Sequence, residues 1–279
     1  MCFDGMTDKN GDSRYSELTE PRGSRTFMGQ GQKGQKGLSM ASLIEPKCDK
    51  KVTKEELLAK MKGKPDFVLE DHYCKGVGAY CLDDDLCVQM VASARLPTRF
   101  GTFTLYGFFD SRDAKEHTAI VQGDVSGKER VPVRVHSECH TGDVWGSLRC
   151  DCRDQLEAAT KYISRQPFGA VIYLKQEGRG IGLLNKIKAY QLQDLGLDTV
   201  EANQFLEMPV DARDYKVAAR IIQLLKIRSV ALLTNNPDKM NQLTAEGIEV
   251  VDRIPIVIPS NRYDEDYLDV KKRKMGHLI

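Results

Sequence analysis

The chain has 279 residues, of which 41% are hydrophobic and 29% are charged, and its formal net charge at pH 7 is +1. This balance excludes the strongly basic surface of a general nucleic-acid-binding protein, and no apolar run reaches the roughly 18 residues of a transmembrane helix. The chain does not begin like a secretory signal, so we expect a cytoplasmic protein that binds neither membranes nor nucleic acid. Its 8 cysteines are therefore expected to be reduced thiols or metal ligands rather than a disulfide framework.

The first part of the chain predicts little regular structure. Residues 1–50 are poor in apolar residues and contain a glycine- and glutamine-rich run, which predicts a disordered tail. At 51–90 we expect a small extension of one short helix, which begins with the capping-box pair Thr53 and Glu56, followed by irregular structure or a few strands. We expect a catalytic domain at 91–279.

The rest of the chain alternates predicted strands and helices. The β-favouring or buried-strand runs are residues 103–109, 118–122, 131–135, 169–174, 229–233 and 248–251. Helical spacing of apolar residues predicts helices at 154–165, 183–195, 215–225 and 236–247. The second of these helices is expected to have an apolar face formed by Leu183, Leu184, Ile187 and Leu195. This order predicts an α/β fold, a layered mixed sheet with helices on its faces.

One short cysteine-rich stretch carries the densest chemistry. Cys139, Cys150 and Cys152 offer three thiols, and zinc is well suited to three thiolate ligands. The spacing allows an open site with a fourth position for water, or a structural site closed by His136 or His140. The residues alone do not decide between these two sites. The remaining cysteines show no ligand spacing and are expected to be free or core thiols.

Two loops and one helix hold further candidate groups. Residues 178–182 form a glycine-rich turn between a predicted buried strand and a helix, where Arg179 would suit a phosphate; a tight turn without a ligand is the alternative. Asp211 and Arg213 would pair a base with a phosphate-binding guanidinium, although a surface ion pair is as common. Tyr190 lies on the predicted helix, where a core aromatic is the ordinary interpretation.

Together these residues resemble the GTP cyclohydrolase II family, which opens the guanine imidazole ring of GTP at the entry to riboflavin biosynthesis. The likeness runs from about residue 91 to residue 279 and is carried by linked segments at 94–98, 134–138, 147–152, 176–179, 182–187, 198–203, 233–237 and 274–278. The resemblance implies a homodimeric zinc hydrolase with one zinc ion per subunit. Its implied ligands are Cys139, Cys150 and Cys152 with the fourth position open, which favours the open site.

The resemblance also implies roles for individual residues. Asp211 would be the proton acceptor, Arg213 would take the nucleotidyl group as pyrophosphate leaves, and Tyr190 would act near the ring being opened. The residues implied to contact GTP are Arg134, Val135, His136, Ser137, Glu138, Gln155, Glu177, Gly178, Arg179, Thr199, Thr234 and Lys239. Mg2+ is expected to accompany the phosphates.

The implied products are formate, pyrophosphate and 2,5-diamino-6-(ribosylamino)pyrimidin-4-one 5′-phosphate. Two other functions stay open: a paralogue that acts on another purine nucleotide or stops at the formylated intermediate, and a non-catalytic, zinc-stabilised nucleotide-binding module. Two positions depart from the family's usual pattern. Glu207 stands where a glycine is usual, and Arg153 replaces a small residue after the last cysteine; neither change removes a named functional group.

Overall fold

The computed structural model describes residues 53–61, 64, 79–83 and 86–259. The predicted tail at 1–50 and the family-like segment at 274–278 lie outside the described residues. The predicted capping box is present at helix α1, Lys54–Met61, where the backbone N–H of Glu56 donates to Thr53 Oγ1 at 3.2 Å and the reciprocal bond is 3.0 Å. No helix within the described ranges is both long and apolar enough to cross a membrane.

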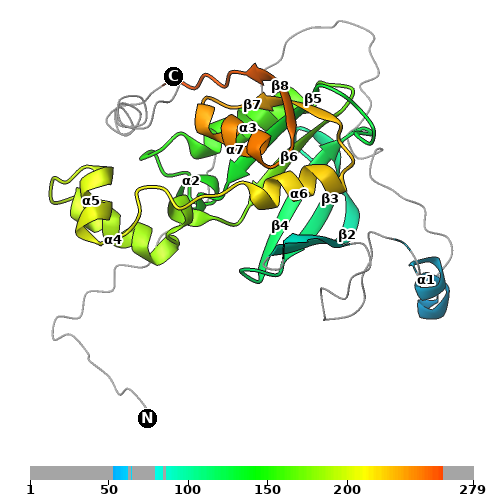
Figure 1. Ribbon diagram of the computed structural model, residues 1–279, viewed down its shortest axis with the longest axis horizontal. Helices are drawn as coiled ribbons and strands as arrows, with labels where there is room; N and C mark the ends of the chain where they lie inside the picture. Colours follow the sequence, from blue (N-terminus) through cyan, green and yellow to red (C-terminus); the bar gives the residue numbers. More distant parts are fainter. Residues whose placement is uncertain (1–52, 62–63, 65–78, 84–85, 260–279) are drawn as a thin grey trace, which may run out of the picture. The chain divides into compact units, whose positions relative to one another are not determined.

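One mixed sheet organises the rest of the described chain, with the strand order β1-β2-β3-β4-β6-β5-β7-β8 (Figure 1). The strands are β1 Ala79–Asp83, β2 Leu86–Thr98, β3 Gly101–Asp110, β4 Lys115–Gln122, β5 Val131–Ser137, β6 Gly169–Leu174, β7 Ser229–Leu233 and β8 Glu249–Ile254. The strands β1, β2, β3 and β4 pair in that order as antiparallel neighbours, and β4 is also antiparallel to β6. The remaining pairs, β6 with β5, β5 with β7 and β7 with β8, are parallel. The predicted mixed α/β sheet is confirmed.

Strand β2 is longer than the short runs expected in this part of the chain. It spans position 91, where we expect the catalytic domain to begin, and it pairs with both β1 and β3. The division into domains stays a prediction. Cys87 on this strand is disulfide-bonded, so the expectation of a free or core thiol was wrong for this residue. Ligand spacing tests only for metal sites and cannot detect a cysteine that pairs with another cysteine.

Helices cover both faces of the parallel half of the sheet. Helix α3, Cys152–Ile163, packs on one face, where its Ile163 meets Val171 of β6. Helices α6, Lys216–Leu224, and α7, Pro237–Ala245, belong to the core on the other face, together with Ile172 of β6. Burial on both faces explains why β6 is almost wholly apolar. Each of its buried Val, Ile and Leu side chains contributes about 1.5–3 kcal/mol.

Strand β5 places the functional residues through its alternation. Its Val133 and Val135 are fully buried in the α6 core, so Arg134 and His136 lie on the opposite face, towards α3. The carboxyl ends of the parallel strands β5, β6 and β7 share one edge of the sheet. Ligands of α/β sheets commonly bind at this edge, and the cysteine-rich loop follows β5 there.

Helices α4, Leu183–Gln193, and α5, Thr199–Phe205, pack on each other to one side of the sheet (Figure 1). We did not predict α5, although its start carries a capping box: Asp198 Oδ1 accepts hydrogen bonds from the N–H groups of Val200 and Glu201 at 2.7 and 3.0 Å. The signal was therefore present in the sequence, but the helix is too short for a clear apolar period.

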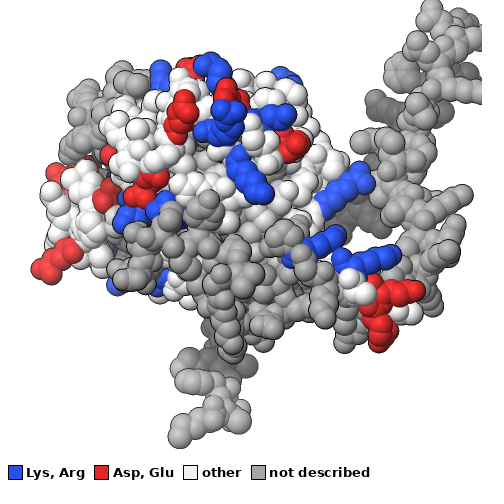
Figure 2. Space-filling view, turned by 45° about the vertical axis from the view of Figure 1, so that its right-hand side comes forward, with Lys and Arg blue, Asp and Glu red and all other residues white. Residues whose placement is uncertain are grey.

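The expected apolar face of α4 is not buried. Leu184 is 74% exposed and Ile187 is also exposed, and Leu195, which lies beyond the end of α4, is 77% exposed. Helical spacing shows that one face is apolar, but it does not show what covers that face. On the face drawn in Figure 2, acidic and basic side chains are interspersed, in keeping with the nearly balanced composition.

Candidate active site

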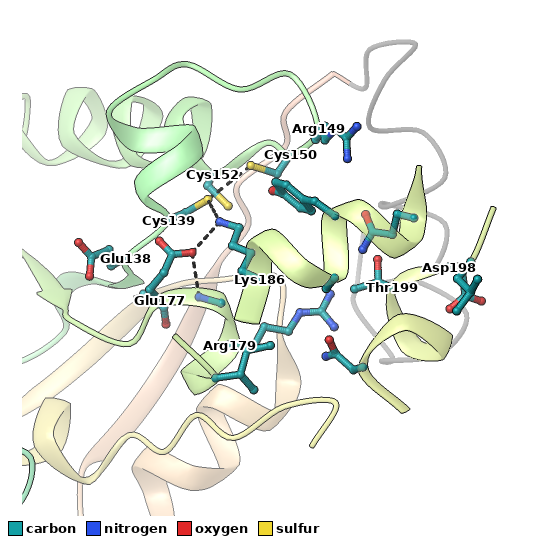
Figure 3. A pocket seen from close by; sticks show the side chains of 18 of the residues that line it. Glu138, Cys139, Arg149, Cys150, Cys152, Glu177, Arg179, Lys186, Asp198 and Thr199 are labelled. Atoms are coloured by element: carbon teal, nitrogen blue, oxygen red, sulfur yellow. Dashed lines mark hydrogen bonds and ion pairs between the residues drawn. The ribbon is translucent and has the colours of Figure 1, made fainter. Parts of the chain in front are cut away.

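Three cysteines converge at the carboxyl end of β5. Their sulfur atoms all lie within 4.8 Å of one another, and the sulfurs of Cys139 and Cys150 are 3.6 Å apart (Figure 3). Cys139 lies two residues after the end of β5 and directly precedes the one-turn helix α2, His140–Asp143, whereas Cys152 begins α3. The end of a strand and the start of a helix therefore bring together thiols that are separated in the sequence.

The three cysteines fit a zinc ion. A Cβ atom at Gly142 would lie 3.1 Å from the sulfur of Cys150 and 3.2 Å from that of Cys139, so only glycine leaves this space open. Hydrogen bonds from the other two thiols lower the pKa of Cys139, whereas the bond to Cys139 raises the pKa of Cys150 to about 11 and also raises that of Cys152. The sulfurs thus share protons that a metal ion would displace.

Neither neighbouring histidine joins this cluster. His136 Nε2 lies 3.2 Å from both carboxylate oxygens of Asp143, its ring stacks on Tyr173, and burial lowers its pKa. The His140 ring packs edge-on against Trp145, with the ring centroids 6.2 Å apart. Among the residues that the structure describes, the cluster has three ligands and no fourth. This arrangement is typical of a catalytic zinc site, whereas a structural site is normally closed by a fourth ligand.

Asp143 fixes the position of the first cysteine. Its Oδ2 accepts hydrogen bonds from the backbone N–H of Cys139 at 3.0 Å and from the Tyr173 hydroxyl at 2.7 Å. Burial raises the pKa of Asp143, but these bonds and the one to His136 outweigh it, so the pKa lies below its usual value. Sequence reasoning missed Asp143, whose signal was a carboxylate within the same motif as the ligands.

A cavity of about 740 Å³ opens beside the three sulfurs (Figure 3). Besides the cysteines, the predicted site residues that line it are Ser137, Glu138, Glu177, Gly178, Arg179, Tyr190, Thr199 and Arg213. They come from β5, the turn before α4, helices α4 and α5, and the loop before α6. The volume is within the range of small-molecule sites.

The glycine-rich turn forms a short 3-10 helix, η2, Glu177–Gly180, with left-handed φ angles of 62° at Gly178 and 58° at Arg179. A Cβ atom at Gly180 would lie 3.0 Å from the backbone of Ala212. Glycine therefore permits this turn to approach the loop that carries Asp211 and Arg213. The N–H of Ala212 donates to the carbonyl of Arg179 at 2.9 Å, which ties the two loops together.

Lys186 lies between the three cysteines and the glycine-rich turn at 178–182. Its Nζ is 3.1 Å from the sulfur of Cys139 and 2.6 Å from Oε1 of Glu177 (Figure 3). The other oxygen of Glu177 accepts a hydrogen bond from the backbone N–H of His140. Lys186 was not among the predicted site residues. Its signal was the position one helical turn before Tyr190, which places both on one face of α4.

Tyr190 is not a plain core aromatic. Its hydroxyl lies 3.4 Å from Thr141 Oγ1, and the Arg149 guanidinium lies 4.9 Å from the centroid of its ring. Burial raises the pKa of Tyr190 to about 12. The hydroxyl therefore keeps its proton at neutral pH and is able to donate a hydrogen bond.

Asp211 and Arg213 form a two-point ion pair. Arg213 Nε donates to Asp211 Oδ1 at 2.8 Å, and a second guanidinium nitrogen donates to Oδ2. Burial raises the pKa of Asp211, but the hydrogen bond and charge of Arg213 outweigh it, so the pKa lies below its usual value. Arg213 lines the cavity, whereas Asp211 is not among the residues that line it.

These positions carry a known family pattern, because residues 89–255 match the family model described as GTP cyclohydrolase II. The chain belongs to this family. It is 56% identical over 192 residues to GTP cyclohydrolase-2 of Picrophilus torridus. The aligned region covers 69% of this chain and 100% of that relative.

Two longer relatives share the same region. The chain is 50% identical to the riboflavin biosynthesis protein RibBA of Synechocystis sp., over 72% of this chain and 36% of that protein. It is 51% identical to RibBA of Bacillus cereus, over 72% of this chain and 51% of that protein. The chain thus spans 36% and 51% of the length of these two RibBA relatives.

A second group of residues implied by the GTP cyclohydrolase II family does not line the cavity. It consists of Arg134, Val135, His136, Gln155, Asp211, Thr234 and Lys239. Arg134 donates to Gln155 Oε1 at 2.6 Å, and Lys239 donates to the carbonyl of Val135 at 2.8 Å. Thr234 accepts from the N–H of Asn236 at 3.0 Å. These side chains are engaged with protein partners, and their contacts with GTP stay predictions.

The two departures from the family's usual pattern have different consequences. Glu207 has a φ of 53°, in the left-handed region that favours glycine. This strain explains why glycine is usual there. Arg153 donates to Glu157 Oε1 at 3.0 Å, one helical turn on along α3, and this partly exposed ion pair leaves the cysteines undisturbed.

Proposed function

We propose that this chain is a GTP cyclohydrolase II that hydrolyses GTP and opens the imidazole ring of guanine. It would release formate and pyrophosphate and leave 2,5-diamino-6-(ribosylamino)pyrimidin-4-one 5′-phosphate, as the first step of riboflavin biosynthesis. The observation that carries the proposal is a single cavity with three converging thiols on one side and Arg179 and Arg213 on another, in a member of this family.

The metal half would consist of Cys139, Cys150 and Cys152 with one zinc ion per subunit. When bound, zinc supplies a water molecule activated as a nucleophile near neutral pH. Three thiolates donate strongly and weaken this effect compared with three imidazoles. The protein's own acid, base and charged groups therefore matter more in this site.

The phosphate half would consist of Arg179 and Arg213, with Mg2+ accompanying the phosphates and Arg213 taking the nucleotidyl group as pyrophosphate leaves. Guanidinium groups suit phosphate oxygens in a two-point geometry. A phosphate that engages Arg213 competes with Asp211 for the same nitrogens. The pKa of Asp211 would then rise towards its ordinary value, and its carboxylate would become a better proton acceptor only when substrate is bound.

The groups around the guanine ring would have complementary roles. Tyr190, protonated and beside the cysteines, can donate a hydrogen bond to an oxygen or nitrogen of the opening ring. Glu138 lines the same cavity and offers carboxylate oxygens to the donor edge of guanine. Gln155 offers both a donor and an acceptor, but reaching the base requires release from Arg134.

We also propose that the protein is a homodimer and that the second copy covers an apolar surface beside the cavity. The exposed apolar residues of the cysteine-rich loop and of helices α4 and α5 are Val144, Trp145, Leu148, Leu184, Ile187 and Phe205. Trp145 is 75% exposed, and contiguous exposed apolar groups commonly mark protein interfaces. Light scattering should show a dimer that Trp145→Glu converts to monomer, whereas Val257→Glu, another exposed position, should leave it dimeric.

The proposed activity is tested by incubating the zinc-loaded protein with GTP and Mg2+ and measuring formate, pyrophosphate and the mass of the pyrimidine. We expect all three in equal amounts, and none from Cys152→Ser. A formylated product would indicate the shortened reaction, and turnover of a different purine nucleotide would indicate a paralogue. GTP bound and returned unchanged would indicate the binding module. The cytoplasmic location stays a prediction.

A further inference from the structure

We propose that Lys186 balances the charge of the three-thiolate site and tunes its sulfur donors. The proposal rests on the metal half of the proposed function and assigns a role to a side chain that the family resemblance did not implicate. Its central observation is the Lys186 ammonium, which contacts both a ligand sulfur and the carboxylate of Glu177 (Figure 3).

The position of Lys186 is tightly defined. Its side chain is 12% exposed, and its Nζ lies 3.1 Å from Cys139 Sγ and 2.6 Å from Glu177 Oε1. A Cβ atom at Gly178 would lie 3.2 Å from the Cβ of Lys186, so the turn packs directly against the stem of this side chain. The packing of the turn against the side chain and the ion pair with Glu177 therefore hold the ammonium at the Cys139 sulfur.

The negative charges of the site call for a nearby cation such as Lys186. Three thiolates and a divalent ion carry one net negative charge, and Glu177 adds another within the same partly buried region. Charges removed from water are tolerated when they are paired and hydrogen-bonded. The groups that face Lys186 are Cys139, Glu177 and the ring of Tyr190, whose centroid lies 5.7 Å from Nζ, with Arg149 against the same ring.

An N–H donor that bonds to a ligand sulfur changes the electron donation and the nucleophilicity of that sulfur. A charge-assisted hydrogen bond draws electron density from Cys139, so this ligand donates less to the metal and is a weaker nucleophile. A bound metal ion would then keep more of the Lewis acidity that three thiolates would otherwise remove. Lys186 is thus a positioning and tuning residue that acts through Cys139, and Glu177 connects this effect to the turn that carries Arg179.

The test uses the cobalt-substituted and zinc-loaded full-length protein. Cobalt reports sulfur donation through its sulfur-to-metal charge-transfer absorption, and alkylation by iodoacetamide, located by mass spectrometry, reports the nucleophilicity of Cys139. In Lys186→Met we expect the absorption band to move to longer wavelength and Cys139 in the zinc-loaded protein to react roughly tenfold faster or more. Lys186→Arg should retain most of the wild-type behaviour.

Lys188→Met is the matched control, because Lys188 lies on the same helix and is exposed, and Asn185 is its one side-chain hydrogen-bond partner among the residues that the structure describes. An unchanged absorption band and alkylation rate in Lys186→Met would overturn the proposal. If that variant does not fold, Lys186→Gln replaces it and must change in the same direction. Failure of both to fold would show a purely structural lysine and overturn the proposal as well. Neither measurement uses GTP, so absence of GTP hydrolysis would refute the proposed function without deciding this test.

Discussion

Replacing Gly142 by alanine gives a sharp test of the metal half of the site. The added methyl carbon would lie 3.1 Å from one sulfur and 3.2 Å from another, whereas ordinary van der Waals contact begins at 3.4 Å. At least two of the three sulfurs must therefore move by a few tenths of an ångström. Zinc–ligand distances in good sites vary by only about 0.2 Å, so this movement is large for the bound ion.

The size of the effect follows from the crowding. One extra methyl group in a filled space costs about 1–3 kcal/mol. If the metal-bound state bears this cost, the zinc affinity of Gly142→Ala falls roughly ten- to a hundredfold. The apo protein should lose less stability, because free thiols can turn away from the methyl group.

Competition with a chromophoric chelator measures the affinity, and circular dichroism checks that the variant is folded. Gly107→Ala is the matched control, because a Cβ atom there meets only the carbonyl of Ala92 at 3.9 Å; we expect wild-type zinc affinity from it. A folded Gly142→Ala protein that binds zinc as tightly as the wild type would refute the reasoning, because the sulfurs would then not be held against this glycine.

Two further predictions concern stability. Glu207→Gly should raise the free energy of unfolding by about 1 kcal/mol, because the left-handed φ of 53° costs an ordinary residue roughly 1–2 kcal/mol and the entropy of glycine offsets part of the gain. Urea denaturation measures this, and a less stable variant would contradict the strain. Asp110→Asn should lower the free energy of unfolding by about 1–3 kcal/mol at neutral pH. Burial raises the pKa of Asp110, but His117 and Arg112 outweigh it and lower the pKa. A carboxylate with a lowered pKa stabilises the fold above its unfolded pKa and loses this contribution on acidification. The difference between wild type and variant should therefore shrink below about pH 4, and a difference that grew there would refute the assignment.

Local signals predicted most of the parallel half of the sheet. Strand β6 was expected at 169–174 and spans Gly169–Leu174, because a short apolar run between a proline stop and a glycine turn has few other interpretations. The helix start at Asn236 was likewise expected, and its side chain accepts from the N–H of Asp238 at 3.0 Å. The antiparallel half was less predictable, since β2 gains its length from pairing with neighbours rather than from its own composition.

The candidate site was predictable in residue types but not in contacts. The cysteine spacing indicated a metal site, yet only the fold shows His136 engaged with Asp143 and His140 against Trp145. Lys186 and Cys139 are far apart in the sequence, and no local sequence pattern predicts their contact. Such pairings depend on how the sheet and α4 are placed, which is tertiary information.

The pairing of α4 and α5 has a dynamic consequence for the cavity. These two helices supply one wall of the cavity through residues such as Tyr190, Thr199 and Asn203, yet they pack chiefly on each other and not on the sheet (Figure 1). Segments with few contacts to the main core open locally at a lower free energy than the core itself. Their amide hydrogens should thus exchange before those of β5 and β6, so that this wall can admit a nucleotide and release products while the cysteine-bearing half stays rigid.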